Sequence, residues 1–90
     1  MDSLNFKESE YIWEKSLAIV REELSEISFE TWLEIIKPIS IYKNTIYLGV
    51  PSDFEKSVLE CRYSKLIKSA LRSITESDLE VKFFTGLYIS

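Results

Sequence analysis

The sequence predicts a small α+β domain in the order α-α-β-β-α-β, with three helices on one face of a three-stranded sheet. Three observations support this prediction. Apolar residues recur every three or four positions in three stretches, two strand-like stretches flank a Lys-Asn pair, and a last stretch alternates apolar and polar residues. A chain of 90 residues is expected to form one domain.

The first helix is predicted to run from about Lys7 to Leu24, with its N-terminus capped by Asn5 or Ser9. Apolar residues form one stripe along it, namely Trp13, Leu17, Val20 and Leu24. Ile12 and Ile19 lie roughly 100° from this stripe. They either widen the buried face or stand outside it.

The second helix is predicted to be short, with Ser28 as its N-cap and Pro38 just beyond its end. Ile27 and Trp32 occupy the two positions that pack as a hydrophobic staple. The expected core face consists of Phe29, Leu33 and Ile36.

Two strands are predicted at 39–42 and 45–50, joined by a two-residue loop at Lys43-Asn44. This register pairs Ile41 with Ile46 and Ile39 with Leu48 on one face. The alternating residues 79–83 form the third strand, whose neighbour in the sheet the sequence leaves open.

The third helix begins at a capping box, Ser52 to Glu55, and is predicted to reach Ile74. Its expected core face consists of Leu59, Tyr63, Leu66, Ala70 and Ile74. Four basic residues gather on roughly the opposite side, namely Arg62, Lys65, Lys68 and Arg72.

The composition is that of an ordinary soluble domain, with 46% hydrophobic and 29% charged residues. No apolar stretch approaches the roughly 20 residues of a membrane span, and the single cysteine, Cys61, fits a reducing cytoplasm. The net charge is −4, so the chain as a whole is not expected to bind nucleic acid through bulk charge.

The sequence offers little chemistry for catalysis or for a cofactor. It has no histidine, which is the commonest general base and nitrogen ligand of metals, and one cysteine cannot build a zinc site. Two glycines, Gly49 and Gly86, cannot form a phosphate-binding loop. We therefore expect a binding module without enzymatic activity, metal or cofactor.

The order of elements and four landmarks resemble the N-terminal domain of the bacterial replication initiator DnaA. The landmarks are Trp13 at the start of the first stripe, SFETW at 28–32, VPSDF at 50–54 and LECRY at 59–63. The similarity covers residues 9–84, which leaves an N-terminal extension at 1–8 and a C-terminal tail at 85–90. Either the chain is the excised first domain or it is a free-standing protein, and the apolar Leu87, Tyr88 and Ile89 favour the second.

The resemblance implies a KH-like fold and a protein-interaction role in replication initiation. It implies weak self-association through Trp13 and its neighbour Ile12, and Ile19, where the family tends to be polar, adds apolar surface beside Ile12. It also implies that a DnaB-type replicative helicase binds at Ser28 and Phe54 and that initiation regulators bind at Ser52 and Phe54. Glu30 and Asp53 are further candidate residues of this helicase and regulator interface. From the residues alone, the stripe around Trp13 fits a core position as well as an interface.

An alternative is a KH-like domain that binds single-stranded nucleic acid through Arg62, Lys65, Lys68 and Arg72. KH domains clamp the nucleic-acid backbone with a GXXG loop, which this sequence lacks. A scaffold or homodimer without a replication role is a third possibility.

Overall fold

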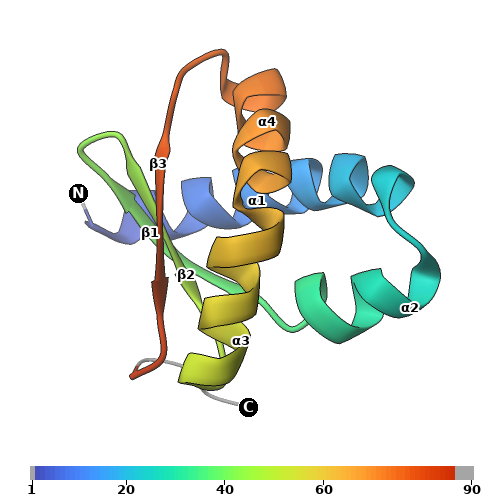
Figure 1. The fold of residues 1–90 in the computed structure, drawn as a ribbon. Coiled ribbons are helices and arrows are strands. Elements are labelled where there is room, and N and C mark those ends of the chain that lie inside the picture. Colours follow the sequence, from blue (N-terminus) through green and yellow to red (C-terminus); the bar gives the residue numbers. More distant parts are fainter. Residues whose placement is uncertain (1, 87–90) are drawn as a thin grey trace.

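The computed structural model describes the backbone of residues 2–86 and the side chains from residue 7 onward. The last four residues of the predicted C-terminal tail lie outside the described residues. In chain order the elements are α1 (Asp2–Glu23), α2 (Glu26–Ser28), η1 (Phe29–Leu33), β1 (Lys37–Tyr42), β2 (Thr45–Gly49), α3 (Asp53–Val58), η2 (Leu59–Tyr63), α4 (Ser64–Thr75) and β3 (Glu80–Phe84) (Figure 1). The π-helical turns η1 and η2 continue the helices that precede them, so the predicted three helices and three strands are confirmed.

The sheet has the order β1-β2-β3, with β1 and β2 antiparallel and β2 and β3 parallel. Lys43 and Asn44 form the predicted two-residue turn, and both have positive φ angles, 48° and 65°. Such a turn matches the natural twist of a hairpin. The side-chain amide of Asn44 donates to the carbonyl of Asp78 at 2.9 Å, which ties the start of β3 to this turn.

The predicted hairpin register is correct near the turn and wrong farther away. Ile41 pairs with Ile46 as expected, but Pro38 rather than Ile39 lies opposite Leu48. A β-bulge between Pro38 and Ser40 adds one residue to β1. The bulge places the side chain of Ile39 over Gly49, where an added Cβ would meet Ile39 Cδ1 at 3.4 Å.

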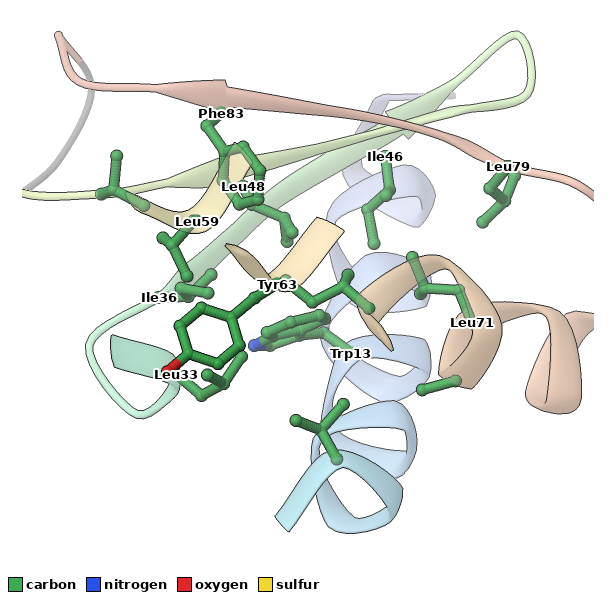
Figure 2. Close-up of a cluster of buried hydrophobic side chains, with 14 of the residues drawn as sticks. Trp13, Leu33, Ile36, Ile46, Leu48, Leu59, Tyr63, Leu71, Leu79 and Phe83 are labelled. Carbon is green, nitrogen blue, oxygen red and sulfur yellow. The ribbon is translucent and has the colours of Figure 1, made fainter. Parts of the chain in front are cut away.

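The hydrophobic core lies between the helices and one face of the sheet. Figure 2 shows Ile46, Leu48 and Phe83 pointing from the strands toward Trp13 and the helices. The buried apolar residues are Trp13, Val20, Phe29, Leu33, Ile36, Ile46, Leu48, Val50, Leu59, Tyr63, Ile67, Ala70, Leu71, Leu79 and Phe83. This set confirms the predicted core face of the second helix, Phe29, Leu33 and Ile36.

Helix α1 begins at Asp2, earlier than the predicted Lys7, because no glycine or proline interrupts these residues. It therefore runs through most of the predicted N-terminal extension. Ser9 lies inside the helix and is buried, so its proposed role as N-cap is wrong.

The second helix also begins earlier than predicted. Its N-cap is Ser25, whose hydroxyl accepts a hydrogen bond from the backbone N–H of Ser28 at 3.1 Å. The assignment of Ser28 as N-cap is therefore wrong. Ile27 is 78% exposed, so the predicted staple between Ile27 and Trp32 is also wrong.

The π turn η2 changes which residues of the long helix face the core. A π turn takes up one extra residue, so the residues after it rotate relative to an uninterrupted α-helix. The buried position is consequently Ile67, while Leu66 and Ile74 are only partly buried. Within residues 2–86, no helix combines the length and the apolar character that a bilayer span requires.

Candidate functional site

Phe54 is an aromatic residue held in an exposed position at the N-terminus of α3. Pro51 ends the preceding strand, and the hydroxyl of Ser52 accepts a hydrogen bond from the backbone N–H of Phe54 at 3.2 Å. The same hydroxyl donates to the carboxylate of Glu55. The predicted N-cap at Ser52 is confirmed, but the bonds differ from those of a capping box, in which the hydroxyl accepts from the N–H of Glu55 and the carboxylate accepts from the N–H of Ser52. The cap fixes the backbone, and the ring of Phe54 remains 66% exposed.

The ring of Phe54 is supported by Trp32. The two ring centroids are 5.8 Å apart and the planes are tilted by 52°. Trp32 lies in η1, is half-buried and packs on the core. The contact therefore joins the N-terminus of α3 to the second helix, and it holds Phe54 against a rigid base.

Ser28 lies on the same side of its helix as Trp32, because residues four apart in a helix share a face. The structure thus brings Trp32 and Phe54 together, and Ser28 lies on the Trp32 side of its helix while Ser52 and Asp53 directly precede Phe54 in the chain. We call these five residues the Phe54 surface. Its centre is aromatic and its rim carries the exposed carboxylate of Asp53.

Glu30 does not belong to the Phe54 surface. Its side chain is exposed, and residues two apart in a helix do not share a face, so we leave Glu30 outside this set. Trp32 is the residue of this surface that the sequence reasoning missed. Its position four residues after Ser28 is the signal that could have placed it there, whereas the predicted staple assigns Trp32 to a contact with Ile27.

The structure places Trp13 in the core, where its side chain is 2% exposed. This matches the core interpretation of its stripe, and it leaves no indole surface for a second copy of the chain. The indole nitrogen has no hydrogen-bond partner among the described residues and lies on the side of the ring that faces Tyr63 (Figure 2). Ile12 and Ile19 are partly buried against the same core.

The basic residues of the long helix are all exposed, but acids neutralise two of them. Arg72 forms an ion pair with Asp78, and Lys68 Nζ lies 3.9 Å from Glu80 Oε1. The guanidinium of Arg62 lies 5.9 Å from the ring centroid of Tyr63. These contacts reduce the positive charge available to a phosphate backbone, so the structure gives the basic helix no feature of a nucleic-acid site beyond its composition.

The described residues also contain no group of three or more cysteine, aspartate or glutamate side chains placed to hold a metal ion. The feature that these residues do offer is a binding surface, in which the exposed ring of Phe54 packs on the half-buried Trp32.

Two comparisons identify the family. Residues 10–73 match the sequence profile of the family described as DnaA N-terminal domain. A chain from the crystal structure of a HobA–DnaA (domain I-II) complex from Helicobacter pylori has a similar fold, with a TM-score of 0.69 and 17% identity over 81% of this chain and 94% of that chain. The profile match covers more than two thirds of the sequence. The protein therefore belongs to the DnaA N-terminal domain family and is a protein-interaction module of replication initiation.

Proposed function

We propose that this domain docks a DnaB-type replicative helicase or an initiation regulator through the Phe54 surface. The observation that carries the proposal is the exposed ring of Phe54 resting on Trp32. Binding energy in interfaces concentrates on a few aromatic or arginine anchors, and a ring held by its own domain loses little freedom on binding.

The family and the structural neighbour support a protein partner. The neighbour was solved in a complex of HobA with DnaA, which makes a regulator of the same kind a candidate partner for this chain. The partner should offer an apolar pocket for the Phe54 ring and a basic or hydrogen-bond-donating rim for Asp53. A surface of this size buries less than about 1,200 Å², so we expect micromolar or weaker affinity.

The proposal also includes weak self-association, but through fewer residues than the sequence predicted. Trp13 is buried, so a second copy could contact only Ile12 and Ile19 from the predicted set. Both residues lie on α1, and part of each side chain is exposed to solvent.

An amide-resolved NMR titration with the N-terminal part of the same organism's replicative helicase tests the proposal, and a parallel titration uses its initiation regulator. We expect localised shifts at Ser28, Trp32 and Asp53. Phe54→Ala should weaken binding at least tenfold, as loss of an anchor residue does. The matched control is Phe84→Ala, which removes another exposed phenyl ring from a different element.

Equal affinity of the wild type and Phe54→Ala would contradict the proposal. Shifts confined to the exposed face of α4 would contradict it as well, because they would move the interface to the basic residues.

A further inference from the structure

Strand β3 leaves one edge of the sheet open. It is the last strand in the order β1-β2-β3, and within residues 2–86 no strand pairs with its outer side. Figure 1 shows β3 in front of the other two strands, with no helix in front of it. An open edge presents backbone N–H and C=O groups with which a strand of another chain can pair.

The backbone groups of β3 alternate between β2 and the open edge. The N–H of Glu80 and the carbonyl of Phe84 bond to the residues that flank β2, at 2.9 Å and 2.8 Å. In a ladder, a residue directs both its N–H and its C=O to one side, and the next residue directs its groups to the other side. Val81 and Phe83 therefore direct their N–H and C=O groups toward the open edge.

The side chains of β3 alternate as well. Phe83 is buried on the core side, and Val81 is partly buried beside it. Glu80 and Lys82 lie on the other face of the strand, and both are exposed. Lys68 Nζ lies 3.9 Å from Glu80 Oε1, but the Glu80 side chain stays 68% exposed. A surface ion pair of this kind is weak, so the carboxylate of Glu80 is available to another partner.

We propose that the open edge of β3 pairs with β3 of a second copy of this chain, antiparallel, about a twofold axis beside Val81. In this register Val81 lies opposite Val81 of the second copy, and the two residues exchange both backbone hydrogen bonds. Glu80 lies opposite Lys82 of the second copy, and the symmetry repeats this pair. Leu79 lies opposite Phe83 on the core side. The two sheets then form one continuous sheet.

The charges of β3 select this register and a second copy as the occupant. A shift of two residues sets Lys82 opposite its own copy in one direction and Glu80 opposite its own copy in the other. Like charges directly opposite each other destabilise a sheet. A shift of one residue would set backbone groups that point toward the edge against groups that bond to β2. The strand is thus complementary to itself in one register, which an unrelated strand would match only by chance.

This interface is separate from the Phe54 surface and from Ile12 and Ile19 on α1, and it does not depend on the proposed function. The pairing is short, so we expect a weak dimer, which sedimentation equilibrium of the full chain measures from about 10 μM to about 1 mM. Hydrogen exchange at the amides of Val81 and Phe83 should slow as the protein concentration rises. Exchange at Glu80, whose N–H already bonds within the sheet, should change little.

Charge reversal provides the decisive variants. Glu80→Lys and Lys82→Glu each set like charges opposite each other twice in the dimer, so each should weaken association about tenfold or more. An equimolar mixture of the two variants should associate again, because the two lysines of one variant lie opposite the two glutamates of the other. The double variant Glu80→Lys/Lys82→Glu should also dimerise like the wild type, and it keeps the net charge of −4.

The matched controls are Glu60→Lys and Lys65→Glu, which make the same changes of charge at exposed positions of the long helix. Both should associate like the wild type. Ile12→Ala/Ile19→Ala is the control for association through α1 and should keep the exchange protection at Val81 and Phe83. Amide spectra of every variant report whether the fold is retained.

Three results would overturn the inference. The first is a wild-type chain that stays monomeric at millimolar concentration. The second is association that both single reversals leave unchanged and that the Ile12→Ala/Ile19→Ala variant abolishes, which would assign it to α1 alone. The third is protection at Val81 and Phe83 that appears only when the helicase or regulator is added, which would assign the open edge to a strand of that partner.

Discussion

The ring of Phe54 lies 5.8 Å from the ring of Trp32, although the whole β1–β2 hairpin separates the two residues in the chain. One ring is half-buried and the other is 66% exposed. This relationship links stability to recognition, because the core-facing ring positions the ring that a partner can reach.

The Trp32–Phe54 contact should appear as energetic coupling. In a double-mutant cycle with Trp32→Ala and Phe54→Ala, we expect a coupling free energy of about 0.5–1.5 kcal/mol, as found for aromatic pairs. Urea unfolding of the four proteins measures it. The control cycle pairs Trp32→Ala with Phe84→Ala, on opposite sides of the sheet, and should be additive within about 0.5 kcal/mol. Additivity in the first cycle would show that the two rings do not support each other.

Trp13→Ala should unfold or nearly unfold the domain. Replacing a buried tryptophan by alanine costs about 3–5 kcal/mol, a large share of the stability of a domain this small. Trp13→Phe should cost less, because it keeps an aromatic ring and removes an indole N–H that has no described partner. Urea unfolding of both variants is the measurement. A folded, stable Trp13→Ala protein that failed only to self-associate would instead support an interface role for this residue.

Ser16→Ala should leave stability unchanged or raise it by about 1 kcal/mol. The change removes a buried hydroxyl that has no hydrogen-bond partner in the part of the chain that the structure describes, and alanine favours the helix. Ser9 is the matched comparison. It is equally buried in the same helix but has an interaction partner, so Ser9→Ala should cost about 1 kcal/mol. Thermal unfolding of the two variants gives both values. A clear loss of stability in Ser16→Ala would point to a hydrogen bond made by a buried water.

Ser25→Ala should destabilise the domain by about 1 kcal/mol, because the side chain that caps the second helix is lost. That loss corresponds to a decrease in Tm of about 4–8 °C in a domain of this size. Ser28→Ala is the control. Its side chain makes no cap hydrogen bond, so its Tm should change little while its affinity for a partner of the Phe54 surface falls. A larger decrease in Tm for Ser28→Ala than for Ser25→Ala would instead identify Ser28 as the N-cap.

The sequence predicted the element order, the turn at Lys43-Asn44 and most core positions. These features follow from local patterns, because the periodicity of apolar residues and the chemistry of a two-residue turn act within a few positions. The same local rules were insufficient at Ser25 and Ser28. Both serines suit an N-cap, and the choice between them depends on which turn lets Phe29, Leu33 and Ile36 reach the core.

The Phe54 surface could be predicted only in part. The capping box places Phe54 in the first turn of a helix, and a resemblance to the family pointed to Ser28, Ser52 and Asp53. The role of Trp32 could not be found in this way, since its contact with Phe54 depends on how two distant helices pack. Glu30 is exposed two positions before Trp32, and its part in an interface stays a prediction.

By itself the sequence determined the class of fold, the absence of histidine chemistry and the turn that joins β1 to β2. The tertiary structure alone decided that Trp13 is buried, that Ile67 replaces Leu66 in the core and that a bulge shifts Ile39 over Gly49. It also decided that Tyr47 and Phe84 meet on the open face of the sheet. The physical reason is that burial and long-range contacts depend on the simultaneous packing of all elements, whereas a local pattern specifies only which faces are available to pack.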